Sequence, residues 1–188
     1  MRAGRLFAGF LWLSGLILFA AGAWIWFDSW QGQEEAREGW AIEAETPVQP
    51  EKATIPLKPG VMARMVFPRI HEERFVLEGA TKKNLSRGPA WLSQTGKPGD
   101  GNCIIAGHRD THFRILKQVK EGDDILLEYG GRQYRYRVTS LHVVRPSNLQ
   151  YLEPAADPVL TLVTCYPFYW VGSAPERYIV RAELAGNS

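Results

Sequence analysis

Short apolar runs at close spacing fill the chain from Val61 onward, and they restrict this part to a mainly β fold. Tyr134–Val138 alternates apolar and polar side chains, which is the period of a half-buried strand. Gly130-Gly131 separates this run from Ile125–Tyr129 and predicts a hairpin with a glycine turn. Further strands are predicted at Met65–Phe67, Phe75–Leu77, Asn102–Gly107, Val159–Val163 and Tyr178–Ala182. Because helical patterns are confined to Lys82–Leu92 and the turn at Phe113–Val119, a sandwich or barrel is favoured.

An uncharged stretch at the amino terminus predicts a membrane anchor. Leu6–Phe27 holds 22 residues without a charge, and at about 1.5 Å per residue a helix of this length covers the ~30 Å hydrocarbon core of a bilayer. Tryptophans cluster at its far end, as they do at a membrane interface. Arg2 and Arg5 precede the stretch, so the positive-inside rule places the amino terminus in the cytoplasm. We therefore expect a single-pass protein of the cytoplasmic membrane with its main domain on the outer side.

A cleavable signal peptide is the alternative, because Ala21-Gly22-Ala23 has the small-residue form of a cleavage site. In either case the rest of the chain is exported. Residues 28–60 are acidic and then rich in proline, which predicts an extended spacer. Residues 61–188 are enough for one independent core. The predicted division is therefore an anchor at 1–27, a spacer at 28–60 and one compact domain at 61–188.

Charge and cysteine content exclude several classes of protein. From Asp28 onward the chain has 20 basic and 20 acidic residues, so it lacks the basic surplus that nucleic-acid binding requires. Two cysteines are too few for a disulfide scaffold, and their flanks lack the spacing of a zinc site. We expect no metal and no cofactor.

Reactive side chains stand where three predicted strands begin or end. His108 follows the strand that ends at Gly107, Cys165 ends another apolar strand, and Arg177 begins the last one. A thiolate is a nucleophile, an imidazole can exchange protons with the departing and incoming amines, and a guanidinium can stabilise an oxyanion. Together they would form a site for acyl transfer.

These residues resemble the motifs of the sortases, which are membrane-anchored cysteine transpeptidases. The resemblance rests on Ala106–Thr111 (AGHRDT), Thr161–Cys165 (TLVTC) and the downstream Arg177, in the family's order. It extends from about Arg64 to Glu183, nearly the whole exported domain. The segment that follows the cysteine is most similar to sortases of Gram-negative bacteria, close to class D.

The resemblance implies an eight-stranded barrel with short helices and assigns a role to each site residue. Cys165 would attack the threonine carbonyl of an LPxTG-like sorting signal, His108 would be the general acid and base, and Arg177 would stabilise substrate and oxyanion. Thr164 matches a residue that helps form the oxyanion hole. The partners would be an exported protein carrying the signal and an amine acceptor. A cysteine hydrolase with the same site, and a non-catalytic anchored domain that binds peptides, are the alternatives.

The remaining polar residues near the motifs have simpler interpretations. Asp110 could orient His108, although a cap on the following short helix is the preferred interpretation. His112 is near enough to line the groove, but the preferred interpretation is an exposed turn residue. We expect Arg109, like Arg135 and Arg137, to lie on a solvated or salt-bridged face. Cys103 lies five residues before His108 inside a strand, so we expect a buried thiol without a disulfide to Cys165. The aromatic residues Tyr166, Phe168, Tyr169 and Trp170 would either line the substrate groove or pack in the domain.

Overall fold

The computed structural model describes residues 60–170 and 172–187, together with scattered positions between 12 and 37. Most of the predicted anchor at 1–27 and nearly all of the spacer at 28–60 lie outside the described residues. Within the described part, none of the helices combines the length and the apolar character needed to cross a membrane.

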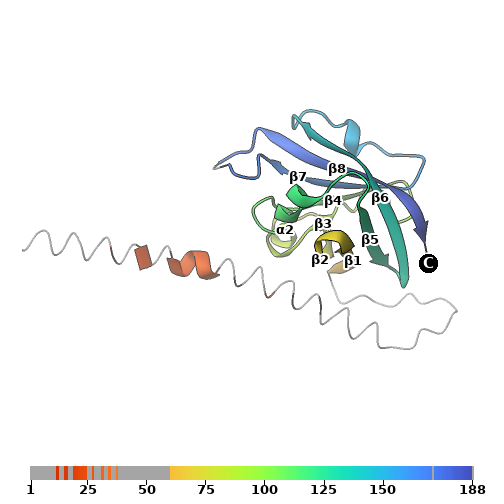
Figure 1. Ribbon diagram of the computed structural model, residues 1–188. Coiled ribbons are helices and arrows are strands. Elements are labelled where there is room, and N and C mark those ends of the chain that lie inside the picture. Colours follow the sequence, from red (N-terminus) through yellow and green to blue (C-terminus); the bar gives the residue numbers. More distant parts are fainter. Residues whose placement is uncertain are drawn as a thin grey trace, which may run out of the picture.

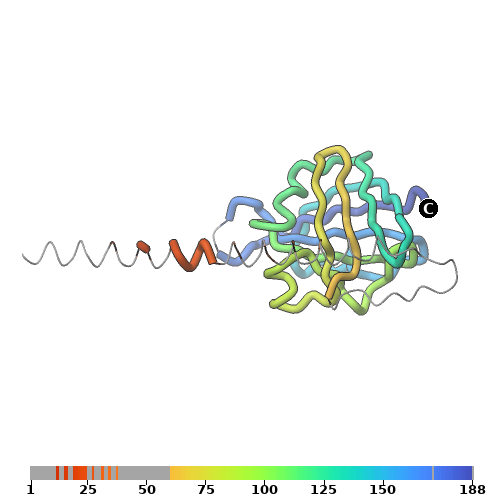
Figure 2. The backbone as a smooth tube through the Cα atoms, turned by 90° about the horizontal axis from the view of Figure 1, so that it is seen from below, coloured from red at the N-terminus to blue at the C-terminus, as the bar shows by residue number. Residues whose placement is uncertain are grey.

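The described strands form a closed barrel in the order β1-β2-β3-β4-β7-β8-β6-β5 (Figure 1). This confirms the predicted β-barrel and every strand named above. Strands β1 and β2 lie across the barrel from β7 and β8, as the two views in Figures 1 and 2 show. The strands are β1 (Val61–Phe67), β2 (Glu72–Glu78), β3 (Ala90–Trp91), β4 (Asn102–Ala106), β5 (Asp124–Tyr129), β6 (Arg132–Val144), β7 (Val159–Tyr166) and β8 (Glu176–Asn187).

The core of the barrel follows from the two-residue period of its strands. Tyr136 and Val138 from the predicted alternating run are both buried in the core cluster. The phenol oxygen of Tyr136 accepts a hydrogen bond from the Gly99 amide at 2.8 Å, so its polar end is satisfied inside the barrel. The predicted hairpin is also confirmed, because Gly130 and Gly131 have φ values of 58° and 73° between β5 and β6. Glycine accepts this left-handed backbone without steric cost.

The helix predicted over Lys82–Leu92 is wrong in its second half. The helix α2 (Lys82–Arg87) begins after Thr81, whose side-chain oxygen accepts from the Asn84 amide at 3.1 Å. It ends before Gly88-Pro89, since proline cannot continue a helical hydrogen-bond pattern. Strand β3 follows at once, parallel to β2 and antiparallel to β4, and its two buried residues close the barrel. The other short helices are η1 (Pro68–Ile70), η2 (Arg114–Gln118), within the predicted turn, and η3 (Gln150–Leu152).

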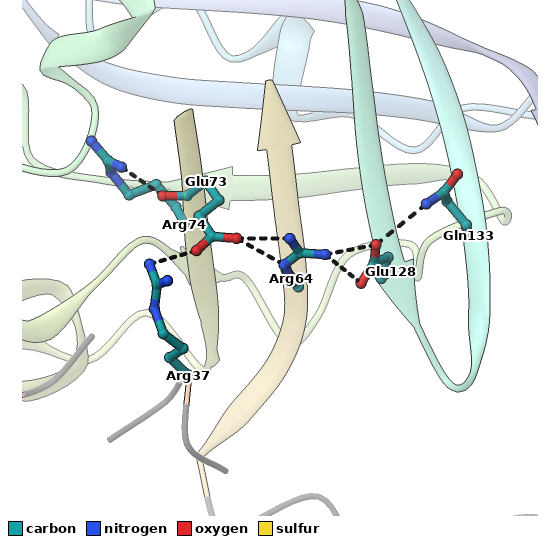
Figure 3. A network of polar contacts seen from close by, with 6 residues as sticks. All are labelled: Arg37, Arg64, Glu73, Arg74, Glu128 and Gln133. Atoms are coloured by element: carbon teal, nitrogen blue, oxygen red, sulfur yellow. Dashed lines mark hydrogen bonds and ion pairs between the residues drawn. The ribbon is translucent and has the colours of Figure 1, made fainter. Parts of the chain in front are cut away.

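A network of charged side chains joins β2, β1 and β5 on the outside of the barrel (Figure 3). Arg64 on β1 lies at its centre and donates to Glu73 on β2 and to Glu128 on β5, each at 2.9 Å. Arg37, one of the described positions before the barrel, contacts Glu73 at 2.5 Å. Gln133 donates to Glu128 at 3.3 Å. Because the pairs share partners, the network orders three strands on the face opposite β7 and β8.

Candidate active site

The predicted site segments meet at one edge of the barrel, around the end of β7. Strand β4 runs parallel to β7 with Ala106 opposite Val163. The ladder continues one residue further, because the Gly107 amide donates to the Val163 carbonyl at 3.1 Å. His108 therefore leaves β4 beside the end of β7 that carries Cys165, and its side chain is exposed.

Strand β8 brings the arginine to the same place. β7 and β8 are antiparallel, and Cys165 and Arg177 are direct partners across the pair. Residues in such positions lie on one face, with Cβ atoms about 4.5–5.5 Å apart. The core residues Leu162 and Val180 pair three positions away, so Cys165 and Arg177 lie on the opposite, outer face. Cys165 is only partly buried there.

The guanidinium of Arg177 is oriented by the connection between β7 and β8. Its Nη1 donates to the Glu176 carbonyl at 2.9 Å and to the Ala174 carbonyl at 3.3 Å. Ala174 belongs to the segment 167–175, which we call the β7–β8 loop and which extends beyond the two strands (Figure 1). The position of the cation therefore depends on the conformation of this loop.

Both threonines of the TLVTC segment attach β7 to β4. The hydroxyl of Thr161 donates to Asn102 Oδ1, and the hydroxyl of Thr164 donates to the Gly107 carbonyl, both at 2.7 Å. Both threonine side chains are buried. Thr164 thus holds the residue before His108 against the residue before Cys165, which places the two reactive groups relative to each other. Its predicted part in an oxyanion hole stays a prediction.

Asn102 is a buried polar residue at the start of β4 that sequence reasoning did not assign to the site. Its Nδ2 donates to the Tyr151 carbonyl at 2.9 Å and to the Glu153 carbonyl at 2.8 Å, while its Oδ1 accepts from Thr161. Its amide therefore fastens the connection between β6 and β7 to the strands that carry the site. The tyrosine ring in turn packs 5.0 Å from the ring of His142 on β6. A polar amide that opens an apolar strand was the only signal in the sequence.

The two cysteines differ as predicted. Cys103 is fully buried in the core, and this burial raises the pKa of its thiol to about 12. Both thiols are free, so the predicted absence of a disulfide between Cys103 and Cys165 is confirmed. A thiol held neutral inside the core cannot act as a nucleophile, which leaves Cys165 as the candidate.

The prediction for His112 is wrong, since this histidine is buried. The turn after His108 folds inward, with the Phe113 amide donating to the His108 carbonyl at 2.9 Å. His112 Nε2 lies 3.4 Å from the Ser86 carbonyl on α2. Burial lowers the pKa of His112 to about 4, the contact with Ser86 opposes this, and the nearby charges of Arg74 and His108 lower it further. His112 is therefore neutral at neutral pH, so it adds no positive charge beside His108.

Arg109 is salt-bridged to Asp110, as predicted, but it does not lie on an open face, because its side chain is only 7% exposed. Its Nη2 donates to the Trp170 carbonyl at 2.7 Å and to the Gly172 carbonyl at 3.3 Å. Packing of the β7–β8 loop over the turn covers the guanidinium, and no local pattern encodes this. Arg137, by contrast, is salt-bridged on the surface to Asp124, as predicted for that residue.

Asp110 lies on the exposed side of the same turn. Its carboxylate accepts from Arg109 Nε at 3.3 Å. The preferred interpretation as a helix cap is wrong, since η2 begins after Phe113, which makes no side-chain cap. An orienting role toward His108 stays a prediction.

Comparison with known proteins decides the family. A family model described as the sortase domain matches residues 65–185, which is most of the barrel. The chain belongs to the sortase family. Similar proteins include sortase D of Bacillus subtilis, 32% identical over 118 residues, and sortase A of Bacillus anthracis, 31% identical over 134 residues. These alignments cover 61% and 69% of this chain, and 59% and 62% of the two relatives. The chain thus matches about three fifths of the length of each relative.

Solved sortases have the same fold. The catalytic domain of B. anthracis SrtD is 30% identical with a TM-score of 0.59, and the comparison covers 76% of this sortase and 97% of that domain. A Clostridium perfringens sortase D5 transpeptidase is 23% identical with a TM-score of 0.63, covering 85% of this chain and 99% of that one. Sortases named D and A both occur among the relatives, so a class D-like chain is compatible with them. The link to Gram-negative sortases stays a prediction.

Proposed function

We propose that this sortase is a cysteine transpeptidase that cleaves an LPxTG-like sorting signal and joins the resulting acyl group to an amine. The main support for this proposal is the arrangement around β7. Cys165 is the direct partner of Arg177 on β8, and the Thr164 hydroxyl donates to the carbonyl of Gly107, the residue before His108. Three groups suited to acyl transfer therefore share one accessible edge of the barrel. Membership of the sortase family supports the same reaction.

In the first half of the proposed reaction, the Cys165 thiolate attacks the carbonyl carbon of the threonine in the signal. The tetrahedral oxyanion is stabilised by the guanidinium of Arg177, which is the direct cross-strand partner of Cys165. The C–N bond then breaks, and the imidazolium of His108 donates its proton to the departing amine. The product of this half is a thioester between Cys165 and the amino-terminal part of the substrate.

In the second half, an amine attacks the thioester carbonyl. Neutral His108 accepts a proton from the attacking nitrogen, the C–S bond breaks, and Cys165 leaves as a thiolate. The enzyme returns to its starting protonation state, and one amide has replaced another. Water in place of the amine would give the hydrolase, since both reactions share the same thioester.

The proposed location is the outer side of the cytoplasmic membrane. The uncharged stretch Leu6–Phe27 with Arg2 and Arg5 before it supports an amino terminus in the cytoplasm and an exported barrel. The substrate would then be an exported protein, and the acceptor amine would belong to a surface component or a second protein.

The test compares two single-cysteine variants in the exported domain. A library of peptides with LPxTG-like signals is incubated with each enzyme, with and without added triglycine, and the thioester and products are identified by mass spectrometry. We expect Cys103→Ala to form the thioester and, when triglycine is present, the new amide. Cys165→Ala should form neither, while its urea unfolding midpoint stays close to that of the unsubstituted chain.

Three other outcomes would contradict the proposal, and each would favour a different alternative. Turnover by Cys165→Ala would remove the cysteine mechanism. A thioester that yields only the free acid at saturating triglycine would assign a hydrolase. Failure of Cys165 to react with iodoacetamide in the folded protein would favour the non-catalytic peptide-binding domain.

A further inference from the structure

Arg109 connects the turn that carries His108 to the loop that orients Arg177. It follows His108 directly in the sequence, yet its guanidinium is turned inward and is nine-tenths buried. The carbonyls of Trp170 and Gly172 both accept from its Nη2. Both bonds come from the two N–H groups of this one nitrogen, whose directions the planar guanidinium fixes. A lysine ammonium is one bond closer to the backbone and rotates freely, so it does not present two donors at the same place in fixed directions.

The contacts continue from the loop to the active site. Gly172 is two residues before Ala174, whose carbonyl accepts from Arg177 Nη1 at 3.3 Å. The path from Arg109 to Arg177 thus consists of two guanidinium contacts joined by a short piece of backbone. Since Arg177 is the direct partner of Cys165, a shift of the β7–β8 loop would change the position of the cation relative to the sulfur.

A second, exposed contact holds the same loop to the helix η2, which follows this turn. The Tyr169 phenol accepts from Lys117 Nζ at 3.1 Å, and the Arg114 guanidinium lies 5.8 Å from the centre of its ring. Both cations are on η2, the helix that follows the turn. The exposed contact is accessible to water and therefore weak, so the buried contact of Arg109 dominates the attachment of the loop.

Burial of the Arg109 guanidinium destabilises the folded state, so packing alone does not explain an arginine at this position. Its Nη1 is buried and has no hydrogen-bond partner among the residues that the structure describes. A buried donor without a partner destabilises the folded state. An apolar side chain would fill this space with less cost, but it would leave the Trp170 and Gly172 carbonyls without a donor.

We infer that Arg109 is a positioning residue that sets Arg177 relative to His108 and Cys165 by clamping the β7–β8 loop to the His108 turn. This role rests on the proposed transpeptidation, in which Arg177 stabilises the oxyanion. Arg109 itself is not a catalytic residue, because its contacts are with two backbone carbonyls and with the Asp110 carboxylate, which all belong to the protein.

The experiment compares the same substitution at two arginines. Arg109→Lys keeps the charge but shortens the side chain and removes the fixed, planar donors of Nη2. Arg64→Lys is the matched control on β1, across the barrel from the site. Amide hydrogen exchange of residues 167–175 reports the clamp without any turnover, and kcat and KM for a peptide substrate report its effect on the reaction. We expect Arg109→Lys to raise exchange in the loop at least tenfold and to lower kcat at least tenfold, with a smaller change in KM. Arg64→Lys should change neither.

If Arg109→Lys does not fold, Arg109→Met replaces it, because methionine fills the space without a buried charge, and the same results are expected. Unchanged exchange in the folded Arg109 variant would overturn the clamp. Faster exchange with unchanged kcat would overturn the positioning role while leaving the clamp. If the unsubstituted chain shows no transpeptidation, the proposed function has failed, and the exchange data still decide whether Arg109 holds the loop.

Discussion

Gly107 precedes the proposed general acid and base, and replacing it with alanine tests how tightly this position is determined. A Cβ atom at position 107 would lie 2.8 Å from both Cγ and Cδ2 of Phe113. The phenylalanine ring is fully buried in the core and cannot simply turn into solvent. The backbone of Gly107 is held as well, because its amide donates a hydrogen bond to the Val163 carbonyl and its carbonyl accepts one from the Thr164 hydroxyl. Either the ring or the backbone must move.

The size of the effect follows from this contact. Introducing a methyl group into a packed site costs about 1–3 kcal/mol, and the reduced freedom of the unfolded chain offsets about 0.4–1 kcal/mol of this. We therefore expect Gly107→Ala to lower the free energy of unfolding by up to about 2.5 kcal/mol. The effect on turnover should be larger, because His108 moves with the backbone and a displacement of about 1 Å can cost about a hundredfold in rate.

Urea unfolding and peptide turnover measure the two effects separately. Gly186→Ala on β8 is the matched control, since a Cβ there meets nothing within 4 Å. Phe113→Leu in the Gly107→Ala background removes ring atoms and should recover part of the lost stability, so the two substitutions should be non-additive. The reasoning is refuted if Gly107→Ala and Gly186→Ala behave alike in both assays, or if the effects at positions 107 and 113 simply add.

Two further predictions concern buried polar residues beside the site. Asn102→Ala removes three hydrogen bonds and should lower the free energy of unfolding by about 2–4 kcal/mol in urea, whereas Thr161→Val, which removes one of them, should cost about 1–3 kcal/mol. Neutral His112 has a pKa of about 4 in the folded chain and an ordinary value near 6.5 when unfolded, so the unfolded state binds more protons between these values. The contribution of His112 to the free energy of unfolding, up to about 3 kcal/mol, is present above pH 6.5 and is lost as the pH falls toward 4. His112→Gln should therefore flatten the dependence of this free energy on pH between 6.5 and 4.

Each of these predictions has its own control. Additive effects of Asn102→Ala and Thr161→Val would show that their shared hydrogen bond contributes nothing. For His112, the comparison is the difference between the substituted and unsubstituted chains, because other groups also titrate in this range. An unchanged slope between pH 6.5 and 4 would show that His112 is protonated in the folded state.

Most of the barrel could be predicted because its strands have recognisable local sequence patterns. The alternation in Tyr134–Val138 and the glycine pair at the turn depend only on neighbours in the sequence, and both predictions were confirmed. Strand β3 was missed because two residues are too short to show a period. Ala90 and Trp91 are a strand only because β2 and β4 lie on either side of them.

The sequence by itself indicated the family and the candidate reactive groups, since thiol, imidazole and guanidinium chemistry belongs to the residue types and the motif order marks the positions. Only the tertiary structure decided which neighbours support them. Arg109, His112 and Asn102 look like ordinary polar residues in the chain, but packing of distant segments buries all three. Burial depends on which segments cover a side chain, and those segments lie 26 to 63 residues away.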